Sequence, residues 1–386
     1  MSNNVYLVSA ARTPVGSFQG ALSTLSAPEL GAHAVQAALA QSDVAADQIG
    51  EVILGNVVSA GLKQAPARQA MRLAGLPDAV GATTINKVCG SGMKATMLAS
   101  DLIRAGSAQC IVAGGMESMS NAPYVLQKAR AGLRMGHTDM KDTLFLDGLE
   151  DAETGNSMGS FAQQTADEYQ LSREAMDAYA TESVIRARQA IENQSLGSEI
   201  APIKINDALV SDDEQPGRAK LDKIPSLRPA FKADGTITAA NSSSISDGGS
   251  ALVLSSERLL DGRAPLAQIV GHATHSIHPS EFTIAPVGAI QKLADNIGWD
   301  LNDVDLFEIN EAFAMVTMLA IQELGLDHAR VNIYGGACAQ GHPIGSTGSR
   351  LIVTLAHALK ATGGRKGIAA LCIGGGEATA IALERS

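Results

Sequence analysis

Residues 89–115, CGSGMKATMLASDLIRAGSAQCIVAGG, pass from a glycine-rich turn through a helical pattern into a short apolar run. Residues 341–376, GHPIGSTGSRLIVTLAHALKATGGRKGIAALCIGGG, repeat this order of turn, helix and strand. The paired strands open at Cys110 and Ile368, an offset of 258. Similarity at a fixed offset indicates a structural unit that occurs twice. The two segments therefore predict a fold with duplicated α/β halves.

A second pair of segments repeats at a similar distance. DQIGEVILGN at 47–56 and NDVDLFEIN at 302–310 each present a helix end, an apolar strand and an asparagine. Asn56 and Asn310 are 254 residues apart, which supports the duplication. Short apolar runs that alternate with helical patterns are typical of α/β proteins with a mostly parallel sheet. In the first half we expect strands at 5–10, 51–58 and 110–115, and helices at 27–41 and 90–106.

The sequence changes in character between the two halves. Residues 121–241 are richer in charge, Met, Asn and Gln, and contain one helical pattern at 171–193. Residues 211–231 are polar with three prolines and predict an extended loop. The strand pattern resumes at 245–256. We therefore predict an N-terminal half of 1–120 plus 242–264, an inserted loop domain of 121–241, and a C-terminal half of 265–386.

Composition excludes several classes of function. The 386 residues are 45% hydrophobic and carry a net charge of −11, which argues against nucleic acid or an anionic membrane as a partner. The N-terminus lacks the pattern of a signal peptide, and no window offers about 18 uninterrupted apolar residues for a membrane span. The four cysteines show no zinc-ligand spacing, so no metal is expected. Free thiols suit a reducing compartment and predict a cytoplasmic protein.

Four short stretches combine reactive or polar residues with glycines or with the end of a strand. Cys89 precedes a predicted helix, whose N–H groups and dipole would favour the thiolate; the alternative is a small buried residue at a turn. His342 could accept a proton, or could simply bond to backbone. Cys372 ends an apolar strand, at the sheet edge where α/β proteins build their sites. Asn310 could hold a water or an oxyanion, or cap the next helix.

Together these residues indicate one site, because the two halves, packed against each other, would bring their strand ends to the same place. Two thiols and a histidine suit covalent acyl transfer, in which one thiol carries the acyl group and the other moves a proton. A nicotinamide dehydrogenase is the alternative that glycine-rich turns suggest. However, no GxGxxG with a suitably spaced acidic residue follows the first strand.

The combined motifs resemble those of the thiolases. CGSG, NEAFA, GHPIGSTG and CIGGG are similar to the four active-site loops of that family, in the same order. The resemblance runs from VSAARTPVGSF through GGMESMSNAPY and TAANSSSISDGG to the C-terminus, and is strongest to the acetoacetyl-CoA type. It implies a five-layered αβαβα fold and a reversible ping-pong reaction, in which two acetyl-CoA give acetoacetyl-CoA and CoA.

The resemblance also implies a role for each residue of the site. Cys89 would be acetylated, His342 would accept its proton, and Cys372 would exchange the second proton with the substrate. The N–H groups of Cys89 and Gly374 would form an oxyanion hole. Asn310 would hold a water that stabilises the enolate.

Coenzyme A is implied as a substrate, with no permanently bound cofactor. By the same resemblance, its contacts would come from the insertion and nearby loops: Ser243, Ala230, Phe231, Met158, Arg218, Ala312 and Phe313. A homodimer, and a tetramer through the segment ESMSNAPYVLQKARAGLRMG, are also implied. Two positions differ from relatives: Ser157 replaces a pocket histidine, and Phe282 stands where many bacterial members carry methionine. The tyrosine that binds potassium in the mitochondrial type is absent near Glu214–Arg218.

Three alternatives within this framework remain open to experiment. A thiolase of broader or longer chain-length range differs only in its pocket. A carrier-dependent ketoacyl synthase would have a Cys–His–His set, against which Cys372 and Asn310 argue. A non-catalytic acyl-CoA binding protein is suggested only by Ser157.

Overall fold

The central strands of this protein are buried on both faces, which explains their nearly unbroken apolar sequences. In β5 (Cys110–Ser118), Ile111 and Ala113 face one core cluster, whereas Cys110 and Val112 face another. The computed structural model describes residues 4–385. All three strands and both helices predicted in the first half are present.

The strands form a ten-stranded sheet in the order β12-β13-β14-β11-β1-β10-β5-β3-β4, with β2 paired to β10. Its members are β1 (Val5–Arg12), β2 (Gly16–Ser17), β3 (Glu51–Gly55), β4 (Gly81–Ile85), β5, β10 (Ser246–Ser256), β11 (Ala267–Ser276), β12 (Leu306–Ile309), β13 (Lys366–Ile373) and β14 (Glu377–Glu384).

Each half of the sheet has the same pairing pattern. In the first half β3 runs parallel to β5, which is followed by antiparallel β10 and β1. In the second, β12 runs parallel to β13, followed by antiparallel β14 and β11. The expected mostly parallel sheet is therefore wrong. The insertion returns the chain through β10 beside β5, and a tight turn joins β13 to β14, so both connections give antiparallel pairs.

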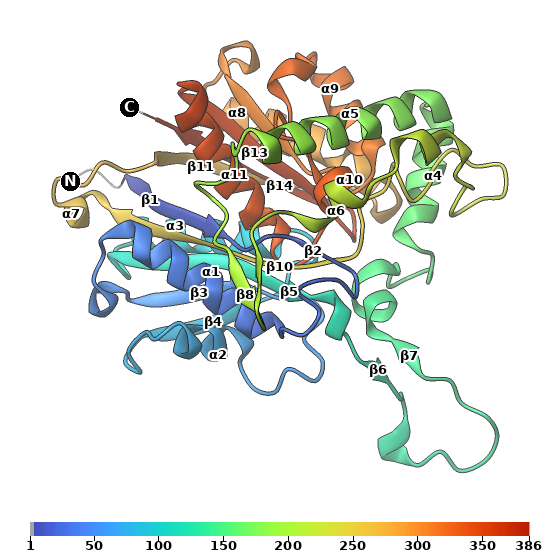
Figure 1. Cartoon of the computed structure of the whole chain (residues 1–386), viewed down its shortest axis with the longest axis horizontal. Coiled ribbons are helices and arrows are strands. Elements are labelled where there is room, and N and C mark those ends of the chain that lie inside the picture. The colour runs from blue at the N-terminus through green and yellow to red at the C-terminus, as the bar shows by residue number, and fades with distance from the viewer. Residues whose placement is uncertain (1–3, 386) are drawn as a thin grey trace.

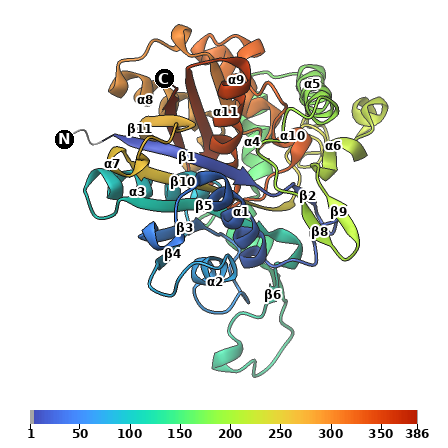
Figure 2. The ribbon, with the colours of Figure 1, turned by 60° about the vertical axis from the view of Figure 1, so that its left-hand side comes forward.

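Helices complete five layers (Figures 1 and 2). Helices α3 (Ser91–Arg104) and α11 (Thr347–Thr362) pack against each other between the two halves of the sheet. Helices α1 (Ala27–Ser42) and α2 (Pro66–Leu73) cover the outer face of the first half. Helices α8 (Ala285–Ile297) and α9 (Ala314–Leu324) cover the outer face of the second. The expected five-layered fold is confirmed.

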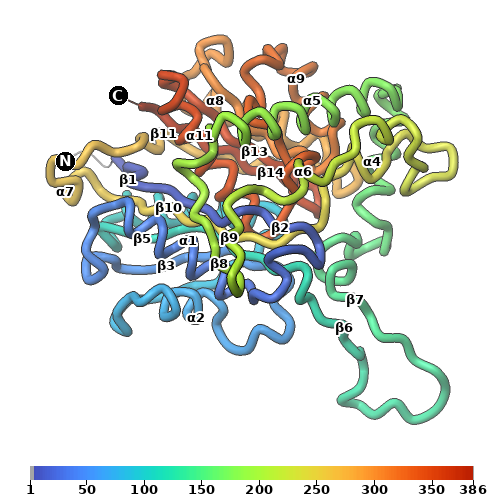
Figure 3. The backbone as a smooth tube through the Cα atoms, viewed as in Figure 1, coloured from blue at the N-terminus to red at the C-terminus, as the bar shows by residue number. Residues whose placement is uncertain are grey.

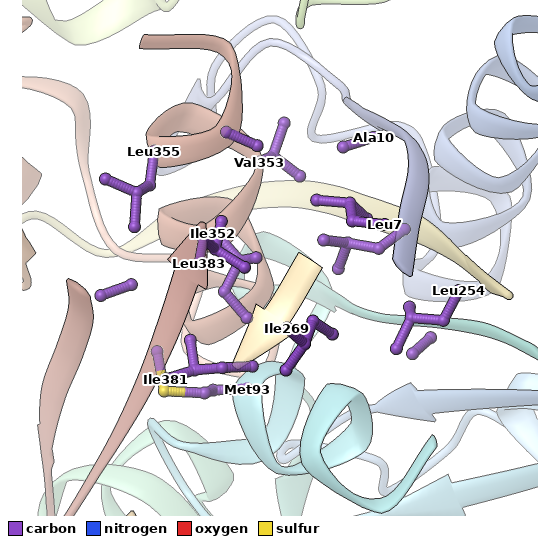
Figure 4. Close-up of a cluster of buried hydrophobic side chains, with 14 of the residues drawn as sticks. Leu7, Ala10, Met93, Leu254, Ile269, Ile352, Val353, Leu355, Ile381 and Leu383 are labelled. Carbon is purple, nitrogen blue, oxygen red and sulfur yellow. The ribbon is translucent and has the colours of Figure 1, made fainter. Parts of the chain in front are cut away.

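The central core joins the two halves. Leu7 and Leu254 from the first half share one buried cluster with Ile381 and Leu383 from the second, and Figure 4 shows Met93 of α3 beside Ile381. Pairing between β1 and β11 covers only three residue pairs, from Val5 to Leu7. Side-chain packing around α3 and α11, rather than this short ladder, therefore holds the halves together.

The predicted repeat offset of 254 is wrong, whereas the offset of 258 places Cys110 and Ile368 alike on outer faces. Ile53 faces the central core, whereas Phe307, 254 residues later, faces the outer core. Because side chains alternate across a strand, an offset of 254 pairs opposite faces, and Asn56 is not the counterpart of Asn310. In the central helices, Gly92 abuts Ser349 while Gly348 abuts Met93. This reciprocal contact relates the two helices by 256 residues.

The insertion contains more regular structure than predicted. The expected helix is α5 (Arg173–Glu192), but α4 (Met158–Glu168) precedes it, and the expected extended loop contains α6 (Glu214–Arg218) and a 3-10 turn at Leu221–Ser226. Smaller elements of the insertion are β6 (Tyr124–Val125), β7 (Lys141–Asp142), β8 (Ile203–Ile205) and β9 (Ala208–Val210). Two short helices, α7 (Glu257–Leu260) and α10 (Ala337–Gln340), lie outside it. In Figure 3 the segment between β6 and β7 extends away from the body. Within residues 4–385, no helix is long and apolar enough to cross a bilayer.

A buried ion cluster attaches the insertion to the first half. Arg12 at the end of β1 donates Nε to Glu199 (2.6 Å) and its two Nη atoms to Asp213 (2.7 and 3.0 Å). All three side chains are excluded from solvent. Removing the guanidinium would leave two carboxylates in a low-dielectric interior, where an unpaired charge is costly.

We expect Arg12→Ala to destabilise the protein by about 3–5 kcal/mol, seen as a lower urea midpoint. Arg72→Ala is a suitable control, because Arg72 is 62% exposed and pairs with exposed Asp78 at 3.4 Å. A pair of that kind contributes at most about 1 kcal/mol. Equal midpoints for the two variants would contradict the stabilising role of the cluster.

Candidate active site

The turn that carries Cys89 is held by hydrogen bonds between neighbouring side chains and its backbone N–H and C=O groups. Ser91 Oγ accepts from Lys87 N (2.8 Å) and donates to Val88 O (2.6 Å). Asn86 Oδ1 accepts from Val88 N (2.9 Å). Val88 has a φ of 47°, a left-handed conformation unusual for a β-branched residue. Such strain is found where the surrounding structure fixes a functional group, and here it presents the next residue, Cys89.

The Cys89 thiol is neutral in the resting protein. Burial raises the pKa of Cys89 to about 11, while the backbone groups of Gly374 and of Cys89 itself act in the opposite direction. Helix α3 begins two residues later at Ser91, as expected. The expectation that its dipole would favour the thiolate is wrong, because the cost of burying a charge exceeds that effect. Cys89 therefore needs a base, and the N–H groups of Cys89 and Gly374 lie close to its sulfur.

His342 has the properties of that base. Thr347 Oγ1 donates to Pro343 O (3.0 Å), so it accepts from His342 Nδ1 at 2.6 Å. The ring proton is thereby assigned to Nδ1, which leaves a lone pair on Nε2. Nε2 is buried and has no hydrogen-bond partner among residues 4–385. Burial, and secondarily the charge of Arg350, lower the pKa of His342 to about 3, so the ring is neutral at working pH.

Cys372 lies in the same site as Cys89. Burial, followed by the electrostatic effect of Cys89, raises the pKa of Cys372 well above its ordinary value. Gly374, two residues after Cys372, contributes a backbone hydrogen bond that acts to lower the pKa of Cys89. The structure thus brings together the two thiols that the sequence separates by 283 residues. Because an ionised Cys89 disfavours ionisation of Cys372, the two thiols are suited to act in turn.

Asn310 follows β12 and carries an unsatisfied amide. Its Oδ1 and Nδ2 atoms are both buried and have no hydrogen-bond partner within the described chain. A buried amide of this kind is suited to a water or a ligand. Ala312 and Phe313, just beyond it, share an apolar cluster with Cys372. Ser243 is also brought here, since its N–H donates to Ala312 O at 2.9 Å.

The residues expected to contact coenzyme A fall into two groups. Met158 and Phe231 adjoin the site: Met158 Sδ would lie 3.2 Å from a Cβ on Gly374, and Phe231 meets Phe313 edge to face at 6.1 Å. Ala230 is exposed beside Phe231. Arg218 is exposed on α6 and donates to Glu214 at 2.8 Å, so its contact with coenzyme A stays a prediction.

Ser157 and Phe282, the two positions expected to depart from the family pattern, have distinct surroundings. Ser157 caps α4, accepting from Ser160 N at 3.2 Å and lying 2.9 Å from Ser160 Oγ. Its hydroxyl is therefore engaged by the helix, a role that a serine performs well. Phe282 is buried in the cluster that holds Cys372 and Met158. Phe282 thus lies in the apolar surroundings of the second thiol.

The structure explains two glycines beside Cys89 and adds residues that the sequence did not reveal. A side chain at Gly90 would overlap Ile373, and one at Gly92 would overlap Ser349. The sequence also gave no indication that Thr347 orients His342, or that buried Glu311 accepts from Cys338 N (3.1 Å) ahead of the histidine loop. These contacts join residues through tertiary packing, for which the sequence offers no signal.

No group of three or more His, Cys, Asp or Glu side chains within residues 4–385 could hold a metal ion. The free cysteines there are Cys89, Cys110, Cys338 and Cys372. What the site offers is a thiol, a neutral imidazole base, a second thiol and converging N–H donors. That set is suited to nucleophilic acyl transfer with proton exchange.

Comparison with known proteins agrees with this chemistry. Sequence profiles of the thiolase N-terminal and C-terminal domains match residues 5–258 and 263–385. An acetyl-CoA acetyltransferase of Pseudomonas aeruginosa is 47% identical over 99% of both chains, and one of Schizosaccharomyces pombe is 45% identical over 100% of both.

Solved structures are also similar. Acat5 thiolase from Ascaris suum in complex with coenzyme A superposes with a TM-score of 0.95 at 41% identity, covering 99% of this chain and 100% of its own. The Bacillus anthracis acetyl-CoA acetyltransferase gives 0.96 at 40% identity, with the same coverage. With both domain profiles matched along the whole length, the chain belongs to the thiolase family.

Proposed function

We propose that this thiolase is an acetyl-CoA C-acetyltransferase, which interconverts two acetyl-CoA with acetoacetyl-CoA and CoA. The observation that carries the proposal is the convergence of the Cys89 thiol, the Gly374 backbone and the buried Cys372 thiol at one site. Full-length relatives named acetyl-CoA acetyltransferase support the choice of substrate. Coenzyme A enters as part of the substrates, and the reaction needs no resident cofactor.

The first half-reaction acetylates Cys89. In the cleavage direction, His342 Nε2 accepts the thiol proton while Cys89 Sγ attacks the 3-keto carbon of acetoacetyl-CoA. Charge develops on the keto oxygen, where the N–H groups of Cys89 and Gly374 stabilise it. The C2–C3 bond then breaks, Cys372 protonates the departing enolate, and acetyl-CoA leaves. Asn310, through a water, stabilises the enolate oxygen.

The second half-reaction transfers the acetyl group to coenzyme A. The Cys372 thiolate takes the proton of the incoming CoA thiol, whose sulfur attacks acetyl-Cys89. Cys89 leaves as a thiolate and recovers its proton from His342. Both cysteines and the histidine then return to their starting protonation states. Synthesis runs through the same steps in reverse, with Cys372 removing an α-proton from acetyl-CoA.

The insertion, residues 121–241, serves this reaction as the main support for coenzyme A. Met158 and Phe231 come from it and adjoin the site, while Ser243 follows directly after it. Ala230, Ala312, Phe313 and Arg218 complete the proposed contact set. We expect Phe231→Ala to lower the rate of acetyl transfer and to raise the KM for coenzyme A.

A comparison of rates across chain lengths tests the substrate. We expect cleavage of acetoacetyl-CoA to have a higher kcat/KM than cleavage of six- to ten-carbon 3-ketoacyl-CoAs. A preference for eight carbons or more would instead favour a thiolase of longer chain-length range. Condensation of a malonyl-carrier thioester without CoA-dependent cleavage would identify a ketoacyl synthase.

The segment 117–136 is the proposed tetramer contact. Beyond β6 it projects from the body (Figures 1 and 3) and exposes large apolar side chains, including Tyr124 at 62% and Met135 at 94%. Exposed apolar groups that gather on one segment are typical of an interaction surface. Light scattering should give the mass of four chains, and Met135→Lys should reduce it to two. A wild-type dimer would exclude the tetramer.

We also propose a cytoplasmic location. The mechanism requires Cys89 and Cys372 as thiols, and both are free in the structure. A reducing compartment preserves that state. Fractionation of the source cells, with immunodetection of the chain in the soluble cytoplasmic fraction, is the test. Recovery in an organelle or with membranes would contradict the proposal.

A further inference from the structure

A buried carboxylate joins the histidine loop to the first half of the molecule. Glu117 lies near the end of β5 and is fully excluded from solvent. Its Oε1 accepts from Asn56 Nδ2 (2.7 Å) and Val58 N (3.2 Å), and its Oε2 from Val57 N (2.9 Å) and Gly345 N (2.9 Å). Three of these donors belong to the first half, whereas Gly345 belongs to the loop that carries His342.

Both oxygens of Glu117 must act as acceptors. Each faces two N–H donors, so a glutamine would place its NH₂ group against a pair of donors and lose two hydrogen bonds. Burial raises the pKa of Glu117 to about 7, while the N–H groups of Val57, Val58 and Gly345 act in the opposite direction. The geometry therefore favours an ionised side chain with charge-assisted hydrogen bonds on both sides.

The loop and the strand meet too closely for a flexible contact. A Cβ on Gly345 would lie 2.6 Å from Glu117 Oε2 and 2.9 Å from Met116 O. A Cβ on Gly115 would overlap the Gly345 carbonyl. Backbone therefore lies directly against backbone at this point, and the glycines permit the approach.

Hydrogen bonds within the loop hold His342 in a defined position relative to Gly345. His342 N donates to Ser244 O (3.0 Å), its Nδ1 bonds Thr347, and Thr347 N donates to Pro343 O (3.0 Å). Residues 342–347 thus form a short, internally bonded unit. On the other side of the carboxylate, Val57 and Val58 share an apolar cluster with Cys89 and Ile344. Glu117 is therefore bonded to the surroundings of both reacting groups.

We propose that Glu117 is a positioning residue, whose carboxylate fixes the 341–347 loop so that His342 Nε2 lies within reach of the Cys89 thiol. The proposal rests on the proposed function, because it takes His342 as the base for Cys89. A second tie, from Ser250 Oγ to Ser346 O (3.0 Å), keeps the loop attached when Glu117 is altered. Loss of Glu117 should therefore displace the loop rather than unfold it.

Alkylation of Cys89 by iodoacetamide, followed by peptide mass spectrometry, tests this role without an acyl-CoA. We expect Glu117→Gln to slow alkylation and kcat by about 10- to 100-fold, with KM for coenzyme A changed by less than about threefold. Glu199→Gln is the matched control. It is another buried carboxylate, bonded to Arg12 (2.6 Å) and Thr354 (3.0 Å) and not to the loop. This control should alkylate within about threefold of wild type at equal folded fraction.

A double-variant cycle separates positioning from general destabilisation. In the His342→Asn background, Glu117→Gln should slow alkylation no further, because the group that it positions is absent. Additive effects, or equal rates for Glu117→Gln and wild type, would overturn the proposal.

If Glu117→Gln does not fold, Gly345→Ala takes its place in the cycle, because the added methyl displaces the same loop while the carboxylate stays. Failure of the wild-type enzyme to cleave acetoacetyl-CoA would contradict the proposed function instead, and leaves the alkylation comparison intact.

Discussion

Replacing Cys89 with alanine is expected to lower acetoacetyl-CoA cleavage by about 10⁴-fold or more. The variant keeps the fold and the oxyanion donors but has no atom to carry the acetyl group, and losing a nucleophile removes most of the catalysis of such a site. Coupled measurement of acetyl-CoA formation, with protein at concentrations that reveal slow turnover, gives the ratio.

Cys110→Ala is the matched control for this substitution. Cys110 is equally a free thiol and lies in the outer core of the first half, away from Cys89. We expect its kcat within about threefold of wild type, since the change removes one buried sulfur and no reacting group. Retention of more than about one part in a hundred of the activity in Cys89→Ala would contradict a covalent mechanism at that residue.

Replacing His342 with asparagine is expected to reduce kcat by about 10²- to 10⁴-fold, the range for loss of a general base. Asparagine retains a polar group but cannot accept the thiol proton. His357→Asn controls for removing a buried histidine from the same part of the chain. His357 lies on α11, with Ser198 at 3.1 Å and Ala10 O at 2.8 Å from its ring nitrogens. If both variants lose activity equally, His342 is not the base.

The burial of His342 also predicts a pH dependence of stability. The unfolded chain takes up a proton near pH 6.5, whereas burial lowers the folded pKa to about 3. A lowered folded pKa means that the unfolded state binds more protons between these values, so wild type loses stability relative to His342→Asn as pH falls. At pH 5 the relative loss should be about 2 kcal/mol compared with pH 8. Urea midpoints of both proteins at the two pH values provide the measurement; a constant difference would contradict the lowered pKa.

The sequence predicted the reacting residues better than it predicted their electrostatics. Cys89, His342 and Cys372 each lie beside glycines at a strand or helix end, a local pattern that can be read directly. Whether Cys89 is a thiol or a thiolate depends on burial by distant segments. Local reasoning from the helix dipole therefore gave the wrong sign.

Helices and strands were predictable where apolar residues recur along the sequence at the spacing of a helix or a strand. The strands of the first half and α5 follow clear apolar patterns. Helix α4 does not, because its buried face includes Gln163 and Thr165 as well as apolar residues. The offset of 254 failed for a related reason: two similar strands can match in sequence while their side chains face opposite sides of the sheet. The contact between Glu117 and Gly345 joins residues 228 apart, which no local pattern reveals.

The central claim is that Cys89 carries the acetyl group between the two half-reactions. Brief incubation with acetyl-CoA, acid quenching and peptide mass spectrometry tests it most directly. We predict a single acetyl group on the peptide containing Cys89, lost when free coenzyme A is added before quenching and absent from Cys89→Ala. An acetyl group on Cys372 or Cys338, or no adduct in an enzyme that cleaves acetoacetyl-CoA, would contradict the account.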